Sequence, residues 1–160
     1  MYVYSFYKFQ KLDNLSKLRE EIYNCLNKYS IKGTVLLSHE GINVNMSQRK
    51  YLLDLAIKDI SKIINLTKVL INKSKTEEIA FQKIKVKIKN EIIKFDYSIE
   101  SHNMKKSGLK SISPRKWEAL LDEDVQLIDM RNNFEYSLGT FKNAIGLRIK
   151  NFTDLIDSSK

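Results

Sequence analysis

Apolar residues in the first part of the chain change their period several times, and the order of these changes leaves few possible folds. Residues 3–9 are aromatic and β-prone, and residues 33–47 contain two short strands around a tight connection at 38–41. Helical spacing predicts a helix capped by Asp13 with the apolar residues Leu15, Leu18, Ile22, Cys25, Leu26 and Tyr29. The same spacing predicts a second helix that buries Leu52, Leu55, Ala56, Ile60, Ile63 and Ile64.

Residues 83–89 alternate strictly between lysine and aliphatic side chains. This period of two predicts a strand with Ile84, Val86 and Ile88 on the core, extended toward residues 92–93. The resulting order of strand, helix, hairpin, helix and strand indicates a ferredoxin-like βαββαβ domain over residues 1–97, in the α+β class.

Positive charge is concentrated in the first part of the chain, although the total is +9. Residues 1–110 hold 21 Lys and Arg against 11 Asp and Glu, whereas residues 111–160 hold 7 against 8. A basic module joined to a neutral one is expected where one part holds a polyanion such as RNA. A generally lysine-rich proteome would produce the same excess.

The alternation places four lysines on one face of the last predicted strand: Lys83, Lys85, Lys87 and Lys89. They repeat at about 6.6 to 6.8 Å, close to the spacing of successive phosphates, so they are candidate RNA-binding residues. Alternatively, the lysines prevent edge-to-edge pairing of strands. Asn43 and Asn45 stand where an RNA-recognition motif would carry stacking aromatics, so we expect any RNA contact to be electrostatic first.

A second segment begins after an exposed linker over residues 98–113. Ser113 and Pro114 have the pattern of a helix N-cap and first helical residue, and Trp117 follows on the predicted helix. A strand at residues 125–128 comes next. The segment 114–160 is too short to close an α/β layer by itself, so we expect an incomplete α/β domain.

The sequence gives no evidence for a metal site, a disulfide, a hydrolase motif or a membrane segment. Cys25 lies on the buried stripe of the first helix, and no Cys/His cluster has zinc-ligand spacing, so neither a structural metal nor an internal disulfide is expected. His39-Glu40 lacks the second histidine of a zincin, and Ser107 to Lys110 match a hydrolase pattern only by chance. No apolar run is long enough to span a membrane and no signal peptide is apparent, so we expect a cytoplasmic protein.

An ordered set of motifs resembles the rhodanese-domain tRNA uridine(34) hydroxylases over nearly the whole chain. The matching residues are Ser5-Phe6-Tyr7-Lys8, Gly33-x-Val35-x-Leu37-x-His39-Glu40-Gly41-Ile42-Asn43, Lys85-Val86-Lys87, Trp117, Ile128 to Tyr136 and Gly139-x-Phe141-x-Asn143-Ala144. The resemblance implies an acylphosphatase-like, ferredoxin-type domain before the start of a rhodanese domain. It also implies oxygen-dependent formation of 5-hydroxyuridine at the tRNA wobble position, with tRNA as partner, molecular oxygen as co-substrate and no bound cofactor.

Carried over by residue, the resemblance assigns Asp129 and Arg131 to a supporting corner, a buried acid and base that hold the active-site loop. His39, Glu40, Gly41 and Asn43 match an N-terminal motif that serves either RNA contact or hairpin geometry. The family's reactive cysteine lies in a Cys-x-Gly-Gly-x-Arg-Cys loop, which we expect beyond Lys160. We therefore predict no catalytic residue within the chain and no activity of the chain alone.

Three functional hypotheses follow. The first is membership of the tRNA hydroxylase family, with a basic N-terminal domain that holds tRNA. The second is a stand-alone RNA-binding remnant without catalysis. The third is a rhodanese-type sulfurtransferase, which would need a persulfide-forming cysteine further downstream.

Overall fold

The computed structural model describes residues 1–66, 68–92, 112–150 and 154. These residues belong to two compact units, an N-terminal unit (residues 1–92) and a C-terminal unit (residues 112–150 and 154). Most of the predicted linker, residues 98–111, lies outside the described part of the chain.

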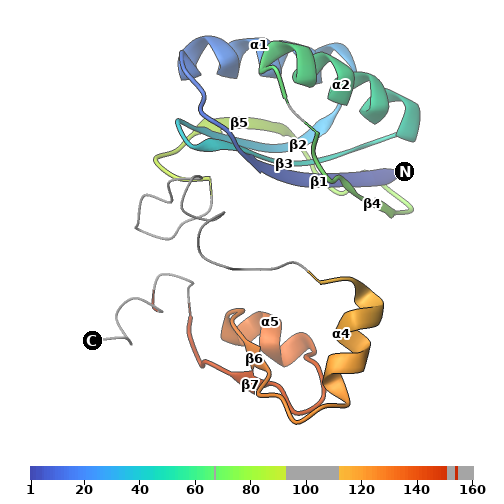
Figure 1. Ribbon diagram of the computed structural model, residues 1–160. Coiled ribbons are helices and arrows are strands. Elements are labelled where there is room, and N and C mark those ends of the chain that lie inside the picture. The colour runs from blue at the N-terminus through green and yellow to red at the C-terminus, as the bar shows by residue number, and fades with distance from the viewer. Residues whose placement is uncertain (67, 93–111, 151–153, 155–160) are drawn as a thin grey trace. The chain divides into compact units, whose positions relative to one another are not determined.

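The N-terminal unit is a five-stranded sheet with two helices on one of its faces (Figure 1). Its elements are, in order, β1(Tyr2–Phe9), α1(Leu15–Lys28), β2(Lys32–Ser38), β3(Gly41–Gln48), α2(Lys50–Ile63), β4(Asn72–Lys75) and β5(Ile84–Ile88). The strand order across the sheet is β4-β1-β3-β2-β5. All neighbours are antiparallel except β2 and β5, which are parallel. This arrangement confirms the predicted α+β, ferredoxin-like fold.

The strand that closes the βαββαβ order is β4, and the prediction that residues 83–89 close it is wrong. β4 follows α2 and pairs with β1 from Tyr2↔Lys75 to Ser5↔Asn72. All four of its residues are exposed, so it carries no apolar pattern that sequence analysis could detect. Residues 84–88 instead form a fifth strand at the opposite edge, beside β2.

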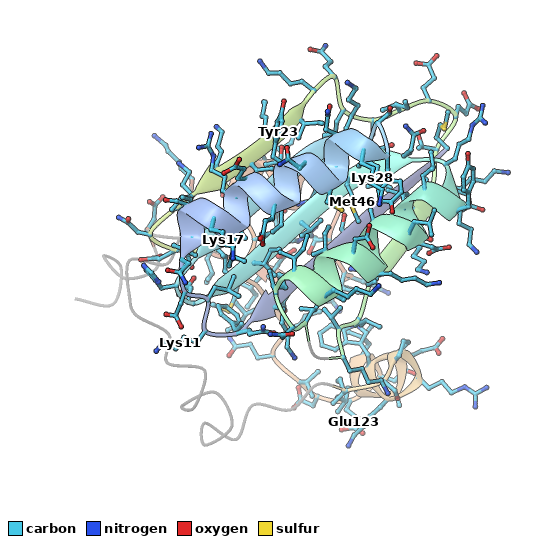
Figure 2. All side chains as sticks on the ribbon, turned by 90° about the horizontal axis from the view of Figure 1, so that it is seen from above. Lys11, Lys17, Tyr23, Lys28, Met46 and Glu123 are labelled. Carbon is cyan, nitrogen blue, oxygen red and sulfur yellow. The ribbon has the colours of Figure 1, made fainter. Side chains whose placement is uncertain are left out.

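The core lies between the helices and the sheet. Figure 2 looks from the helix side, where α1 and α2 lie side by side over the strands and Met46 of β3 is visible between them. Met46 and its strand neighbours Ile42 and Val44 are fully buried. From the helices, the buried side chains are Leu15, Ile22, Cys25 and Leu26 of α1 and Leu53, Ala56 and Ile60 of α2.

Three details of the predicted core are wrong. Asp13 does not cap α1, because Leu12 is buried before the helix and Asn14 takes the N-cap position, with φ 53° and no side-chain cap. Leu53 rather than Leu55 faces the core from α2, since it falls in line with Ala56 and Ile60. Ile88 is 42% exposed because β5 ends there at the sheet edge.

The C-terminal unit contains α4(Pro114–Leu121), β6(Ile128–Asp129), α5(Asn133–Leu138) and β7(Ile145–Gly146). Ser113 caps α4 as predicted, since its Oγ accepts a hydrogen bond from the backbone N–H of Lys116. The predicted strand at 125–128 is shorter and later, because only Ile128 and Asp129 pair with β7, in parallel. β6 and β7 are parallel strands connected through α5, which makes a small βαβ arrangement. Its assignment to the start of a rhodanese domain stays a prediction.

Candidate functional site

The four candidate lysines lie along one edge of the N-terminal sheet. Lys85 and Lys87 belong to β5, Lys83 and Lys89 flank it, and all four are exposed. Val86 between them is buried against the core, so Lys85 and Lys87 extend from the face opposite the helices. This position is compatible with phosphate binding and also with the alternative role of protecting an edge strand.

The pairing of the strands aligns residues in rows across this helix-free face, which we call the open face. One row consists of Tyr7 on β1, Asn43 on β3, Leu36 on β2 and Lys87 on β5. The next row consists of Asn72, Ser5, Asn45, Thr34 and Lys85. The open face therefore joins the lysine edge to the asparagines that the sequence had singled out.

Sequence analysis missed Tyr7, which is 58% exposed at one end of the first row. Its neighbours Tyr4 and Phe6 are buried on the helix side. Alternation along a strand places Tyr7 on the opposite face from Phe6, so the signal was present in the sequence. Across the described strands of this unit, the positions on the open face carry no Asp or Glu.

The residues of the N-terminal motif make contacts within their own unit. The His39 ring donates from Nδ1 to the Leu12 carbonyl at 3.0 Å, next to the start of α1. Glu40 Oε1 accepts the backbone N–H of Ile92 at 2.8 Å, and Asn43 Nδ2 donates to the Ile92 carbonyl at 3.3 Å. These contacts join the β2–β3 hairpin to Leu12 and to Ile92, which is a structural role for His39, Glu40 and Asn43 within this unit.

Gly41 is required by close packing of the backbone. Its φ is +154°, and a Cβ atom built there would lie 2.0 Å from the carbonyl oxygen of Lys8. No side chain can be accommodated at that distance from a neighbouring strand. Gly41 therefore has a structural reason to be glycine in this motif.

Cys25 is a core residue, as predicted. It is 7% exposed on α1, and its Sγ donates to the Ala56 carbonyl of α2 at 3.9 Å. Burial raises the pKa of its thiol to about 11, with the nearby Asp59 carboxylate adding to the effect. A thiol that is protonated at neutral pH and shielded by two helices is unsuited to nucleophilic chemistry.

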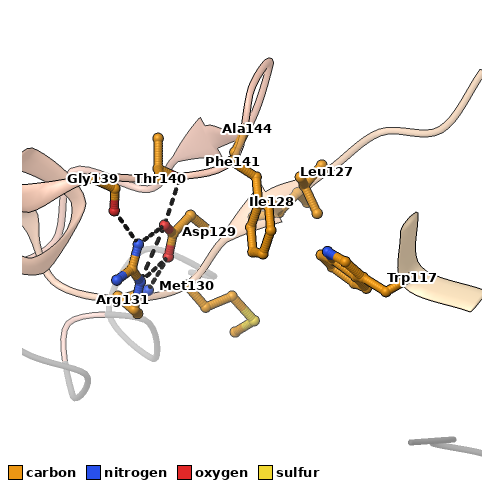
Figure 3. Close-up of a pocket in the computed structure, with 10 residues that line it drawn as sticks. All are labelled: Trp117, Leu127, Ile128, Asp129, Met130, Arg131, Gly139, Thr140, Phe141 and Ala144. Carbon is orange, nitrogen blue, oxygen red and sulfur yellow. Dashed lines mark hydrogen bonds and ion pairs between the residues drawn. The ribbon is translucent and has the colours of Figure 1, made fainter. Parts of the chain in front are cut away.

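In the C-terminal unit, Asp129 and Arg131, which the resemblance assigns to a supporting corner, form an ion pair after β6 begins. Arg131 Nη2 lies 2.6 Å from Asp129 Oδ2, and its Nε donates to Oδ1 at 3.0 Å. Thr140 Oγ1 donates to the same carboxylate at 2.8 Å, while Arg131 Nη2 also donates to the Gly139 carbonyl at 2.7 Å (Figure 3). The Asp129 side chain is 9% exposed as expected, but that of Arg131 is 46% exposed rather than buried.

These contacts determine what the corner can do. Hydrogen bonds from the side chain and backbone of Arg131, and from Thr140, hold the pKa of the Asp129 carboxyl far below its usual value. A carboxylate held so firmly in its charged form is a poor proton acceptor. Its chemical role is to join the end of β6 to the turn at Gly139 and Thr140 by charge-assisted hydrogen bonds.

A hollow of about 500 Å³ lies next to this corner. The Trp117 and Phe141 rings form part of its wall, with ring centroids 5.3 Å apart (Figure 3). Leu127, Ile128 and Met130 add further apolar surface. Among the described residues, its lining holds no thiol and no imidazole, and its surface is mostly apolar beside the Asp129–Arg131 pair.

Neither a metal centre nor a membrane span is found in the part of the chain that the structure describes. No group of three or more His, Cys, Asp or Glu side chains among these residues is placed to hold a metal ion. No described helix is long and apolar enough to cross a bilayer.

Comparison with known proteins adds to this geometry. Residues 1–92 match the family described as the UPF0176 acylphosphatase-like domain. The chain is 38% identical over 154 residues to a tRNA uridine(34) hydroxylase of Pelagibacter ubique (strain HTCC1062). This similarity covers 95% of this chain and 50% of that protein. The chain is 32% identical over 154 residues to a tRNA uridine(34) hydroxylase of Legionella pneumophila (strain Corby), covering 96% of this chain and 60% of that protein.

Among solved structures, the chain is similar to the acylphosphatase from Bacillus subtilis, with a TM-score of 0.44 and 12% sequence identity. That similarity covers 54% of this chain and 98% of the acylphosphatase. The chain spans about half the length of the curated relatives that it matches.

Proposed function

This chain belongs to the UPF0176 family through its acylphosphatase-like domain, and from this membership we propose that it functions in the hydroxylation of tRNA uridine 34. The reaction is the oxygen-dependent formation of 5-hydroxyuridine at the wobble position. Molecular oxygen is a co-substrate, and no cofactor bound to these residues is required. tRNA is the macromolecular partner, and the cytoplasm is the expected location.

The observation that carries this proposal is the extent of the similarity. It runs over 154 residues and therefore includes parts of both units rather than the N-terminal domain alone. Within it lie the motif from His39 to Asn43 and the corner of Asp129 and Arg131. A relative that shared only an acylphosphatase-like fold would not extend into the second unit.

In this proposal the N-terminal unit holds the tRNA. Lys83, Lys85, Lys87 and Lys89 provide positive charge along one sheet edge, and the open face beside them carries no acid in the described strands. Such a surface attracts the phosphate backbone without reading its sequence. The excess of positive charge in residues 1–110 supports the same assignment.

The proposal assigns no catalytic step to these 160 residues by themselves. Cys25 is their single cysteine, and its burial and raised pKa keep it protonated. The carboxylate of Asp129 is committed to Arg131 and Thr140. The C-terminal unit therefore contributes a supporting corner, and the reactive cysteine expected for this family has to come from elsewhere.

Activity is tested in cells that lack their endogenous tRNA uridine(34) hydroxylase. The chain is expressed in these cells, and 5-hydroxyuridine is quantified in total tRNA by mass spectrometry beside cells that express a full-length relative. We expect the relative to restore the modification and the chain alone to leave it absent. Restoration by the chain alone would contradict the assignment of catalysis to other residues.

RNA binding is tested through its dependence on salt. Replacing Lys83, Lys85, Lys87 and Lys89 together by Gln is expected to weaken tRNA binding and to reduce the slope of log K against log salt by up to about three units. The control replaces the helix lysines Lys17, Lys50, Lys58 and Lys62 by Gln, which changes the net charge equally on the other face. Equal slopes in both variants would remove the lysine edge from the proposal.

A stand-alone RNA-binding role without catalysis is the second candidate. The buried state of Cys25 favours it over sulfur transfer, because a sulfurtransferase needs an accessible thiolate to carry a persulfide. This candidate predicts tRNA binding by the chain without any hydroxylated product, so restoration of 5-hydroxyuridine by the chain alone would exclude it.

A further inference from the structure

We propose that the open face of the N-terminal sheet is a platform for an unpaired base of single-stranded RNA, with Tyr7 as the stacking surface. This inference rests on the proposed function and names the part of the RNA that the N-terminal unit receives. It adds base recognition to a surface that the sequence had indicated for phosphate contact alone.

Tyr7 is presented as a rigid aromatic surface. It lies on β1, where it pairs with Asn43 of β3 beyond the stretch of β1 that pairs with β4, and it is 58% exposed. The ring packs edge-on against Phe9, with centroids 6.0 Å apart and an interplanar angle of 74°. Because Phe9 packs against the edge of the ring, part of the side-chain entropy is already lost before a base stacks on it.

Amide groups lie directly beside this ring. Asn43 is the partner of Tyr7 across the β1–β3 pair, and Asn45 stands two residues further along β3 on the same face. Asn45 Nδ2 donates to Asn43 Oδ1 at 3.3 Å. Among the described residues, this contact leaves the Asn45 amide oxygen and one N–H available. A paired acceptor and donor of this kind matches the exposed edge of an unpaired base.

The lysine edge lies at a suitable distance from the aromatic ring. Tyr7 and Lys87 are at the two ends of one row and are separated by three strand spacings, or about 14 Å. Lys85 lies in the next row, two residues from Lys87 along β5, or about 6.7 Å away. A short run of nucleotides can therefore place a base on Tyr7 and its neighbouring phosphates near Lys85 and Lys87.

The arrangement favours unpaired over paired RNA. A base inside an A-form duplex is stacked on both faces, and its edge lies in a groove that a flat sheet does not enter. A base in a loop has a free face for the ring and a free edge for the amides. The single-stranded loop of a tRNA is thus the expected occupant of the open face.

The experiment measures binding of a fluorescein-labelled anticodon stem–loop RNA to the whole chain by fluorescence anisotropy. We expect Tyr7→Ala to weaken binding by about 5- to 150-fold, the effect of removing an aromatic that stacks on a base. Tyr7→Phe should retain the affinity, because the ring remains. Tyr51→Ala is the matched control, since Tyr51 is 57% exposed on α2, on the opposite side of the sheet.

A duplex RNA of the same stem, without the loop, forms the second arm. It should bind more weakly than the stem–loop and respond equally to Tyr7→Ala and Tyr51→Ala. Equal effects of these two substitutions on stem–loop binding would overturn the platform. So would a duplex that binds as tightly as the stem–loop.

The lysine variant distinguishes failure of this inference from failure of the proposed function. If the quadruple Lys→Gln variant loses affinity while Tyr7→Ala retains it, the basic edge binds RNA and the platform is wrong. If neither variant changes the affinity, the RNA-binding role of the N-terminal unit is wrong as well. Circular dichroism melting checks that each variant keeps its fold.

Discussion

The hydroxyl of Tyr4 donates a 2.8 Å hydrogen bond to the carboxylate of Asp54 and so joins the first strand of the sheet to the second helix. Lys73 of β4 donates to the same carboxylate at 3.4 Å, and its Nζ lies 4.6 Å from the centre of the Tyr4 ring. The cluster thus connects α2, β1 and the edge strand β4. It gives β4, which lacks apolar residues, a side-chain attachment to the rest of the unit.

Removing this hydrogen bond is expected to destabilise the N-terminal unit. Tyr4→Phe and Asp54→Ala should each lower the free energy of unfolding by about 1 kcal/mol, a modest value because the carboxylate is partly exposed. The double variant should lose less stability than the sum of the two single losses, since both substitutions remove the same hydrogen bond. Urea unfolding followed by far-UV circular dichroism measures all three. Full additivity would show that the hydroxyl and the carboxylate are not coupled.

The same carboxylate makes stability depend on pH in the acid range. Desolvation by itself would raise the pKa of the Asp54 carboxyl. The Tyr4 hydrogen bond and the positive charge of Lys73 outweigh this effect and lower the pKa in the folded chain. The Tyr29 hydrogen bond, together with Lys28, likewise lowers the pKa of Asp59. Groups with a depressed folded pKa stabilise the fold above their unfolded pKa, about 3.9, and lose that contribution as the pH falls further.

We therefore expect the unfolding free energy to fall as the pH decreases below about 4 to 5. Asp54→Asn should make the decline shallower, so that the difference between this variant and the native chain shrinks toward low pH. Urea titrations at a series of pH values measure the effect. A constant difference across the series would mean that the Asp54 charge does not contribute.

Gly41 is expected to tolerate no side chain. Gly41→Ala places a Cβ atom 2.0 Å from the Lys8 carbonyl at a φ of +154°, so the hairpin has to shift away from β1. The combined overlap and backbone strain should cost about 2 kcal/mol or more. Lys11→Ala, at an exposed position nearby, is the control and should change stability by less than about 0.5 kcal/mol. Equal thermal midpoints for the two variants would refute the packing argument.

The two units should differ in their resistance to local opening. β6 and β7 pair over two residues each, and Ile128 is 48% exposed. Val44, by contrast, is fully buried in β3, which is paired on both sides. We expect the amides of Leu127 and Ile128 to exchange with deuterium much faster than that of Val44. Equal protection in native-state hydrogen exchange would show that the C-terminal unit is more stable than its pairing indicates.

Much of the fold could be predicted from local patterns. Period-two alternation identified a strand at residues 83–89 with Val86 on the core, and 3.6-residue spacing identified both helices. Ser113 was recognised as a cap because its chemistry acts within one helical turn. The prediction of individual cap residues was less accurate. Asn14 rather than Asp13 is the N-cap of α1, since Leu12 is buried before the helix and α1 begins one residue later than predicted.

The candidate site was predicted less completely. The lysines, Asn43 and the Asp129–Arg131 corner could be singled out because each lies within a short motif. Strand alternation could have placed Tyr7 on the face opposite Phe6, but its relation to Asn43 exists only through the β1–β3 pairing. A residue 36 positions away in the chain becomes a neighbour only when the sheet forms.

The sequence by itself determined the type and order of the main elements, since these depend on the spacing of apolar side chains along one segment. Only the tertiary structure decided which strand closes the sheet. β4 has an entirely exposed sequence, and its place is set by backbone pairing with β1 and by the contacts of Lys73 with Tyr4 and Asp54. Backbone hydrogen bonds are the same for every sequence, so a strand held mainly by them leaves no pattern in its own residues.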